Sequence, residues 1–410
     1  MNPNIKQLHS YPFEKWASLK ADVQENPNYP AIALSIGEPK HASPQFVLDE
    51  LVTNLRSVAS YPLTKGSNEL RESIANWLNR RFRLNSTPID PQSQVIPVNG
   101  TREALFAFAQ AMIDPTTPHS AERPLVLAPN PFYQIYEGAA ILAGAELLFL
   151  NTTRENQFAP DLDDIDEKTW QRCQLIYICS PGNPTGKVLS AQYLEKLLDL
   201  ADKYDFIIAS DECYSEIYFD ENTPPPGLLQ VAAATGRTSY KNCVVFHSLS
   251  KRSNLPGMRS GFVAGDADIL KNFLRYRTYH GCAMAPPIQA ASIAAWNDEE
   301  HVKQNRELYR EKFDAVLAIL KPVLDVEAPD AGFYLWAKTP INDQAFAKAL
   351  YAEKNITVLP GSFLSRVQNN INPGENYIRM ALVAETNQCI TAANHIKNFV
   401  CSLPTSLFKN

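Results

Sequence analysis

Short apolar runs that alternate with amphipathic helical patterns are the feature of this sequence that most restricts its fold. Runs that are apolar at nearly every position are expected where helices cover both faces of a largely parallel sheet. The runs are Val95–Val98, Pro124–Leu127, Glu146–Leu150, Leu175–Cys179, Phe206–Ala209, Cys243–Phe246 and Gly261–Ala264. Between them, apolar residues recur at helical spacing, for example over Glu69–Phe82 and Ala191–Tyr204. The alternation predicts a doubly wound α/β architecture.

The carboxy-terminal third has a different pattern. A long charged helical stretch, Glu299–Leu320, is followed by short apolar runs and two more helical segments, one of them Asp343–Lys354. This order predicts a smaller α+β domain. A chain of 410 residues is also too long for one ordinary compact core. We expect a large α/β domain over residues 44–285 and a small domain, made from residues 1–43 and 286–410, that closes over the site.

The composition excludes several classes of protein. A formal net charge of −6 gives no footprint of a nucleic-acid or membrane surface. No apolar run is long enough to cross a membrane, and the amino terminus lacks the apolar core of a signal peptide. The 7 cysteines are scattered without a C-x-x-C pair, which is typical of reduced thiols and of neither a disulfide framework nor a zinc site. We therefore expect a cytoplasmic protein that binds no metal.

The segment Ser248-Leu249-Ser250-Lys251 places a lysine just after a strand-like run, and Arg259 follows shortly after. Two hydroxyls and a guanidinium near one amine suit a ligand that carries a phosphate at one end and an amine-reactive group at the other. Pyridoxal phosphate is such a ligand, because its aldehyde condenses with a lysine and its phosphate needs an anion site. A surface loop with a stray lysine is the alternative interpretation.

Two further segments lie near the ends of strand runs, at the edge where open α/β sheets bind ligands. In Asn99–Ala104, Gly100 permits a tight turn and the amides of the following helical turn face an anion. A plain helix start would have a similar sequence. In Pro131–Tyr136, Tyr133 offers an aromatic face on which a flat heteroaromatic ring could stack. Core packing is the alternative for this tyrosine.

Two more segments supply polar groups at the same edge. Ser180–Gly186 is a rigid turn that holds Asn183, whose amide could donate to a phenolate oxygen. Asp211 comes directly after the run that ends at Ser210, and a carboxylate that emerges from a buried strand is unfavourable unless it is paired. A protonated pyridine nitrogen is a suitable partner. A helix N-cap is the alternative role for Asp211.

These segments occur in the order and approximate spacing found in fold-type I pyridoxal-phosphate aminotransferases of class I and II. The chain resembles that family over nearly its whole length, from Leu34–Pro39 to Tyr377–Arg379, and Tyr61–Gly66 with Glu69–Arg71 is similar to the family's Y-x-x-x-x-G-x-x-E-L-R segment. One departure is Ser260, where the family usually has a small apolar residue. The resemblance implies an α/β fold with a largely parallel seven-stranded sheet covered by helices, and a smaller α+β domain.

The resemblance also implies a site for pyridoxal 5′-phosphate. Lys251 would form an aldimine with its aldehyde, Asp211 would pair with its pyridine nitrogen, and Tyr214 would hold its 3′ oxygen. Asn183 would share that oxygen, and Tyr133 would stack on the ring. The residues implied around the phosphate are Gly100, the amides of Thr101 and Arg102, the hydroxyls of Ser248 and Ser250, and Arg259.

For the substrate, the resemblance implies that Arg379 grips the α-carboxylate and that Gly37 and Asn183 approach it. Tyr61 would reach the phosphate of a neighbouring subunit, so a homodimer with shared active sites is expected. Lys251 must also carry a proton between the substrate and the cofactor. An ordinary lysine pKa of about 10.4 would hinder this, and a positively charged, partly dehydrated pocket would lower it.

Within the family, Ser35–His41 and Asn130–Gln134 most resemble the bacterial succinyldiaminopimelate aminotransferases of lysine biosynthesis. The resemblance implies ping-pong transamination between N-succinyl-diaminopimelate and 2-oxoglutarate. An aspartate or broad-range aminotransferase shares all the residues named above, and a carbon–sulfur β-lyase uses the same scaffold. A regulator fused to a DNA-binding module is disfavoured because no basic helix-turn-helix segment precedes Tyr61. A cofactor-free scaffold is disfavoured because the full set of cofactor residues is present.

Overall fold

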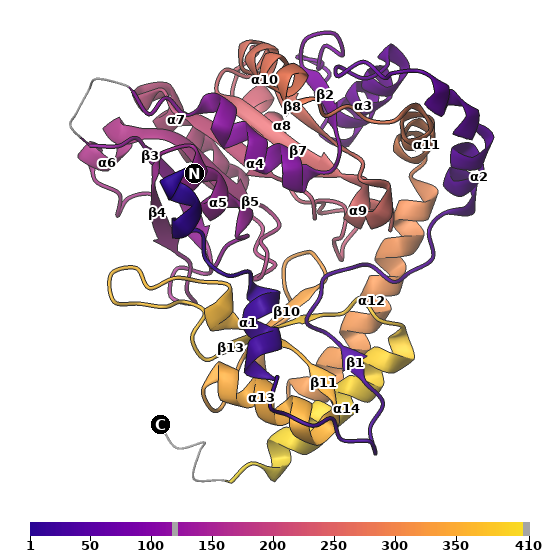
Figure 1. Ribbon diagram of the computed structural model, residues 1–410, viewed down its shortest axis with the longest axis vertical. Helices are drawn as coiled ribbons and strands as arrows, with labels where there is room; N and C mark the ends of the chain where they lie inside the picture. The colour runs from indigo at the N-terminus through magenta and orange to yellow at the C-terminus, as the bar shows by residue number, and fades with distance from the viewer. Residues whose placement is uncertain (117–121, 405–410) are drawn as a thin grey trace.

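A computed structural model describes residues 1–116 and 122–404. Within them the largest sheet has seven strands, in the order β2-β8-β7-β6-β5-β3-β4 (Figure 1). Strand β8 is antiparallel to both of its neighbours, and the other neighbouring pairs are parallel. The strands are β2 (Val95–Val98), β3 (Leu125–Asn130), β4 (Glu146–Asn151), β5 (Cys173–Cys179), β6 (Ile207–Asp211), β7 (Cys243–Ser248) and β8 (Gly261–Gly265). The prediction of a largely parallel seven-stranded sheet is confirmed.

Helices cover both faces of this sheet, which explains why its strands are apolar at nearly every position. On β7, Cys243 and Val245 pack into one hydrophobic cluster, and Val244 and Phe246 pack into the other. The first cluster includes residues of α3 (Asn68–Arg81), α6 (Glu167–Arg172), α7 (Ala191–Tyr204), α8 (Leu228–Ala234) and α11 (Pro286–Asn297). The second includes residues of α4 (Thr101–Met112), α5 (Ile135–Leu142) and α10 (Ala267–His280).

Local capping residues fix the ends of the best-predicted helices. The Ser190 side chain accepts a hydrogen bond from the amide of Tyr193 at the start of α7, and Asp205 ends the helix in the left-handed conformation. Such an N-cap stabilises a helix by about 1 kcal/mol. The helix predicted over Ala191–Tyr204 has the same bounds in the structure. The helix predicted over Glu69–Phe82 is α3, which begins and ends one residue earlier.

The rest of the chain builds a second hydrophobic core around a four-stranded antiparallel sheet, in the order β12-β13-β10-β9. Its elements are β9 (Asp325–Val326), β10 (Tyr334–Lys338), α13 (Asp343–Lys354), β12 (Leu359–Pro360), β13 (Tyr377–Ala381) and α14 (Thr386–Ser402). Segments from both ends of the sequence meet here, because β1 (Ile32–Ala33) pairs with β11 (Ile356–Thr357). Trp16 of α1 (Pro12–Leu19) also packs in this core. Helix α1 was not predicted, because eight residues are too few to show a clear helical period.

One long helix joins the two cores. Helix α12 (Glu300–Leu320) descends between them in Figure 1. Near its start, Asn305 accepts a hydrogen bond from Asn254 at 3.0 Å, beside the end of β7. Near its end, Val316 and Leu320 are buried in the second core. A second connection is the ion pair of Arg366 with Glu137 of α5, with N–O distances of 2.6 and 2.8 Å.

The remaining short elements lie outside the two main sheets, and the last of them packs in the second core. They are α2 (Gln45–Thr53), α9 (Leu249–Arg252) and the 3-10 helices Pro3–Gln7, Leu55–Ala59, Pro256–Met258 and Gly361–Phe363. One boundary differs from the expectation: Asp211 is the last residue of β6 and does not follow the strand. No helix in the described part of the chain is both long and apolar enough to span a membrane.

Candidate active site

A cavity of about 670 Å³ lies where the carboxyl ends of β5, β6 and β7 face the second core. The predicted site residues that line it are Gly37, Thr101, Arg102, Tyr133, Asn183, Asp211, Tyr214, Ser248, Ser250, Lys251, Arg259 and Arg379. Gly100 lies directly beside it, because an added Cβ would meet the Arg259 guanidinium. Tyr61 is fully exposed and does not line the cavity of this chain. Segments of both cores therefore contribute residues to one site.

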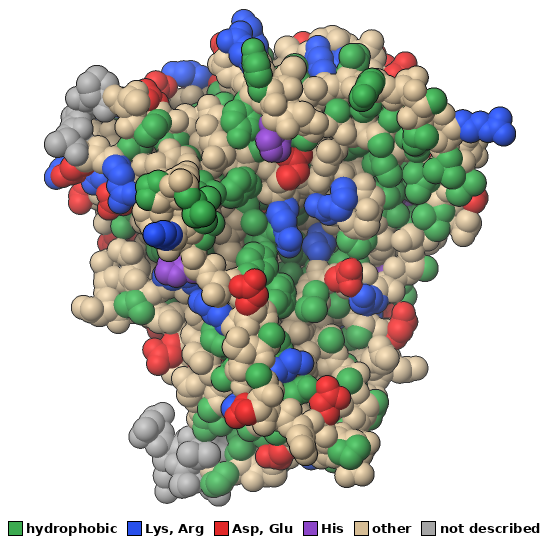
Figure 2. All heavy atoms as spheres, viewed as in Figure 1, with side chains coloured by type: hydrophobic (Ala, Val, Ile, Leu, Met, Phe, Trp, Pro, Cys, Tyr) green, Lys and Arg blue, Asp and Glu red, His purple; other side chains and the backbone are tan. Residues whose placement is uncertain are grey.

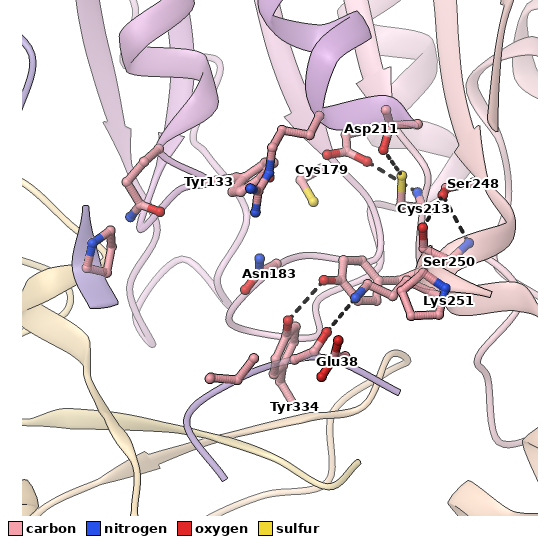
Figure 3. Close-up of a pocket in the computed structure, with 18 of the residues that line it drawn as sticks. Glu38, Tyr133, Cys179, Asn183, Asp211, Cys213, Ser248, Ser250, Lys251 and Tyr334 are labelled. Atoms are coloured by element: carbon pink, nitrogen blue, oxygen red, sulfur yellow. Dashed lines mark hydrogen bonds between the residues drawn. The ribbon is translucent and has the colours of Figure 1, made fainter. Parts of the chain in front are cut away.

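Asp211 is a buried carboxylate that faces the cavity, with only 4% of its surface exposed (Figure 3). Burial raises its pKa, and hydrogen bonds from Cys213 and Tyr136 counteract that effect. The Tyr136 hydroxyl donates to Oδ2 at 2.8 Å. Among the described residues, no cationic side chain forms an ion pair with Asp211. Since a buried charge is unfavourable without a partner, the carboxylate suits a cationic group of a ligand. The alternative N-cap role is wrong, because Asp211 is the last residue of β6 and no helix begins directly after it.

Lys251 lies on the short helix α9, directly after β7. Its pKa is lowered to about 8, mainly by burial and in part by the nearby charges of Arg379 and Arg102. The direction agrees with the expectation, although burial and not positive charge is the largest cause. The ammonium donates a short hydrogen bond to the Gly37 carbonyl oxygen and lies 5.3 Å from the centre of the Phe333 ring. The alternative of a stray surface lysine is therefore wrong.

The start of α4 offers groups that suit an anion at the other end of the cavity. No side chain caps this helix, so the amides of Thr101 and Arg102 point toward the cavity end. The residue before them, Gly100, has φ 85°, and a Cβ there would lie 2.1 Å from Arg259 Nη2. The hydroxyls of Ser248 and Ser250 lie 2.9 Å apart on the same side of the cavity. Amides, hydroxyls and a guanidinium together suit a phosphate.

Arg379 of β13 supplies a second guanidinium from the opposite wall. Its Nη1 donates to the Asn183 side-chain oxygen at 2.9 Å, and its Nη2 donates to the Ser35 carbonyl at 2.8 Å. Its Nε is buried and has no partner in the described protein. The guanidinium also lies 4.4 Å from the centre of the Tyr334 ring. A fork held in this way can bind a carboxylate with two oxygens.

Two tyrosines of the site were not found from the sequence. The Tyr334 hydroxyl lies 3.0 Å from that of Tyr214 (Figure 3), and burial next to Tyr334 raises the pKa of Tyr214. These residues are 120 positions apart, so no local pattern could link them. Tyr136 follows Tyr133 after one helical turn, and this spacing could have indicated it. Tyr133 is half-buried and accepts a hydrogen bond from Arg102 Nε at 2.7 Å, so it is a cavity residue as well as a packed one.

The donor set fits pyridoxal phosphate. A buried carboxylate that lacks a cation would pair with the ring nitrogen, a lysine with a lowered pKa would meet the aldehyde, and the start of α4 would take the phosphate. Each of these groups faces the same cavity. The protein thus has a partner of matching charge for each polar group of that cofactor.

Known proteins resemble this chain over almost its full length. The family described as Aminotransferase class I and II matches residues 29–396. An LL-diaminopimelate aminotransferase from Nitratidesulfovibrio vulgaris is 32% identical, covering 96% of this chain and 97% of the relative. The crystal structure of an aminotransferase from Neisseria meningitidis is 50% identical with a TM-score of 0.92, covering 97% of this chain and 100% of that one.

A third similar protein is a probable N-succinyldiaminopimelate aminotransferase from Thermus thermophilus. Its structure is 26% identical with a TM-score of 0.83, and the match covers 94% of this chain and 99% of that one. The family match and the arrangement of the cavity lead to the same assignment. The chain belongs to the class I and II aminotransferases, which are fold-type I enzymes that depend on pyridoxal phosphate.

Proposed function

We propose that this aminotransferase exchanges an amino group between N-succinyl-diaminopimelate and 2-oxoglutarate, a reaction of lysine biosynthesis in the cytoplasm. The observation that carries the proposal is the Arg102 guanidinium at the mouth of the cavity. It contacts the Tyr133 hydroxyl and lies 5.7 Å from the Tyr11 ring, and no carboxylate in the described chain pairs with it. A long substrate with a distal carboxylate would reach it. The names of the similar proteins, which concern diaminopimelate or its N-succinyl derivative, support the same substrate class.

The acidic groups of the cavity favour the succinylated substrate over LL-diaminopimelate. LL-diaminopimelate has both an ammonium and a carboxylate at its distal end, whereas the succinylated compound has an amide in place of that ammonium and carries an additional carboxylate. The acids among the lining residues are Asp211 and Glu38. Asp211 is buried deep in the site, and Glu38 is already paired with Lys40 at 2.5 Å. A distal carboxylate therefore has a free partner in Arg102, and a distal ammonium has none of comparable quality.

In the proposed mechanism, the bound cofactor supplies the sink for the electron pair left when the substrate Cα loses a proton. Lys251 takes that proton, since a pKa of about 8 increases its neutral fraction at pH 7 by about two orders of magnitude over an ordinary lysine. Asp211 would favour protonation of the ring nitrogen of the cofactor, and Tyr214 with Asn183 would hold its 3′ oxygen. Arg379 binds the α-carboxylate and so orients the bond that breaks.

We also propose that the enzyme is a homodimer in which Tyr61 reaches the phosphate site of the partner. Tyr61 is fully exposed, and its neighbours Leu55, Val58 and Leu63 are exposed as well. Figure 2 shows hydrophobic side chains gathered on this part of the surface, near α2. A contiguous apolar surface of this kind is typical of an interface. The division into a large domain (44–285) and a small domain (1–43 and 286–410) that closes over the cavity is part of the same proposal.

A substrate panel tests the proposed activity. The cofactor-loaded enzyme is assayed with 2-oxoglutarate and, in turn, N-succinyl-diaminopimelate, LL-diaminopimelate, aspartate, aromatic amino acids and alanine. We expect the highest kcat/KM for the succinylated compound. A higher value for LL-diaminopimelate or aspartate would replace the proposal with that activity, and release of pyruvate and ammonia from a sulfur amino acid without a keto acid would indicate a β-lyase.

The variant Arg102→Ala tests the distal contact within the same panel. It keeps the backbone amide at the phosphate site and removes only the guanidinium. We expect kcat/KM for the succinylated substrate to fall by about tenfold or more, because a charge-assisted hydrogen bond is lost. Alanine, which has no distal group, is the control substrate, and an equal loss for alanine would contradict the assignment.

A further inference from the structure

A buried lysine outside the catalytic cavity pairs with a histidine instead of an acid. Lys312 of α12 is 1% exposed, and its ammonium lies 2.5 Å from Nε2 of His41 and 3.5 Å from the Val383 carbonyl oxygen. It forms no ion pair with any carboxylate in the described chain. Lysines are almost never fully buried unless they are paired, so this arrangement requires an explanation.

The hydrogen bonds around His41 fix the position of its proton. Asn305 Nδ2 donates to the backbone carbonyl of Lys251 at 3.4 Å, so Asn305 Oδ1 is the atom that faces His41 Nδ1, at 2.7 Å. The same oxygen accepts from Asn254 at 3.0 Å. His41 Nδ1 must therefore carry the proton. Since an ammonium can only donate, Nε2 must accept from Lys312 and carries none. The imidazole is neutral, with its proton on Nδ1.

His41 ends a segment that touches both predicted reactive groups of the site. We call residues 35–41 the strap. The Ser35 carbonyl accepts from Arg379 at 2.8 Å, and the Gly37 carbonyl accepts from the Lys251 ammonium. Upstream, β1 fixes the chain to β11 through backbone hydrogen bonds. Downstream, the His41 side chain links the strap to α12.

We propose that His41 is a positioning residue, which anchors the strap against Lys251 and Arg379 as the neutral Nδ1–H tautomer that the buried Lys312 ammonium imposes. The proposal rests on the proposed roles of Lys251 and Arg379. The chain of contacts runs from Lys312 through His41 and Asn305 to the backbone of Lys251. These contacts link α12, the helix between the two cores, to Lys251 and to the strap.

The surroundings of His41 favour the neutral form. Its ring packs against Tyr309 of α12 in a tilted arrangement, with 4.6 Å between ring centres. Burial lowers its pKa below the usual 6.5, Lys312 lowers it further, and Asn305 and Glu385 act in the opposite direction. Glu385 and Cys389 of the α14 region act on Lys312, whose pKa burial lowers. Because the pKa of His41 is depressed, the anchor is complete above about pH 6.5 and weakens as the pH falls through the folded-state pKa.

Nitrogen NMR of the cofactor-loaded enzyme with 15N-labelled histidine tests the tautomer. The signals of His41 are identified by their loss in His41→Gln. We expect a neutral Nδ1–H ring at pH 7, and a raised pKa of His41 in Lys312→Met, because that change removes a neighbouring positive charge. Lys303→Met, on the exposed face of the same helix, should leave the pKa unchanged. A wild-type ring protonated on Nε2, or a His41 pKa that does not respond to Lys312→Met, would overturn the proposal.

Hydrogen exchange tests the anchoring. His41→Phe keeps an aromatic ring against Tyr309 but removes both hydrogen bonds, so we expect the strap amides to exchange about tenfold faster with or without cofactor. The KM for the amino acid should rise with little change in cofactor affinity, since the phosphate site lies on other segments. Asn305→Ala removes the hydrogen-bond partner of His41 Nδ1, so it should give the same pattern. His41→Gln keeps a side chain that can form hydrogen bonds, so its strap exchange rate should lie between those of His41→Phe and the wild type.

A normal rate of strap exchange in a folded His41→Phe or Asn305→Ala enzyme would refute the anchoring role. A general loss of stability, with cofactor affinity falling in parallel and the strap unaffected relative to other segments, would also refute it. Neither NMR nor exchange depends on turnover. If the proposed catalytic role of Lys251 were wrong, these two measurements would still test the anchoring role of His41 separately.

Discussion

At the scale of single residues, burial acts on the acid and the base of the site in opposite directions. It raises the pKa of Asp211 and lowers that of Lys251, so it disfavours the charged form of each. Within the protein, Asp211 receives hydrogen bonds but no counter-ion. Its carboxylate is stabilised fully only when a cation occupies the cavity. In the proposed site, this unpaired charge would contribute to cofactor binding.

Replacement of Tyr136 tests how far its hydroxyl keeps Asp211 ionised. The hydrogen bond from Tyr136 lowers the pKa of Asp211, so Tyr136→Phe should raise that pKa. We expect kcat to fall by about tenfold and the acid-side limb of the kcat/KM profile to move to higher pH by about one unit. Tyr177→Phe is the control, because Tyr177 is equally buried and donates to the Leu105 carbonyl. Identical profiles for the two variants would contradict the role of Tyr136.

Replacement of Lys251 tests the covalent attachment. Lys251→Ala removes the amine that we expect to bond to the cofactor aldehyde, so turnover and the visible absorbance of the bound cofactor should both be lost. Borohydride reduction of the wild-type enzyme, followed by peptide mapping, should find the cofactor fixed to the peptide that contains Lys251. Attachment at another lysine would refute the assignment.

At the scale of elements, the site depends on where strands end and helices begin. Asp211, Ser248 and Cys179 are the last residues of β6, β7 and β5, so parallel strands bring them to one edge. Helix α4 begins at the same edge, and its uncapped amides face the cavity. Gly100 makes this start possible, since a side chain there would occupy the place of the Arg259 guanidinium.

The variant Gly100→Ala should lower cofactor affinity in addition to its effect on the stability of the fold. With φ 85° and ψ 151°, Gly100 lies in a region open almost only to glycine, so any side chain is strained by about 1–3 kcal/mol, and the added methyl also displaces Arg259. Gly236→Ala is the matched control, because its φ is 82° and an added methyl would have no neighbour within 4 Å. We expect both variants to lose unfolding free energy, and a cofactor Kd raised by about tenfold or more only in Gly100→Ala. Equal cofactor affinities would contradict this anion site.

At the scale of the whole molecule, the cavity lies between two cores, and no local sequence pattern indicates how these cores meet. Both ends of the chain enter the second core, where β1 pairs with β11. The Arg366–Glu137 ion pair and α12 connect that core to the large sheet. The exposed apolar residues around Tyr61 remain without a partner in one chain of 45.8 kDa, which is the physical basis for the proposed dimer.

A charged substitution in this surface tests the dimer. We expect the wild type to sediment with twice the mass of the 45.8 kDa chain. Val58→Asp should weaken the dimer and lower cofactor retention, because burying an unpaired carboxylate in an interface is unfavourable and Tyr61 would be lost from the partner site. Val367→Asp is the control, since Val367 is also well exposed but lies in the second part of the chain. A monomeric wild type, or a dimer indifferent to Val58→Asp, would contradict the proposal.

Much of the architecture follows from local sequence. The seven apolar runs correspond to the seven strands, and Ala191–Tyr204 is a helix with the predicted bounds, because periodicity and capping act over a few residues. Strands that are apolar at nearly every position indicate burial on both faces of a sheet. The helical layers on both faces of the large sheet could therefore be predicted from the sequence. The same patterns indicated Lys251, Asp211 and Gly100, since each follows or ends such a strand.

Only the tertiary structure decided which distant residues meet. Tyr334 bonds with Tyr214, and His41 lies between Lys312 and Asn305, over separations of 120, 271 and 264 positions. No periodic signal links such pairs, because their approach depends on how the two cores pack and on where α12 crosses between them. The sequence by itself determined the strands, the helices and the chemical character of the site. The packing of the two cores determined the shape of the cavity, the pKa shifts that burial causes and the anchor of the strap.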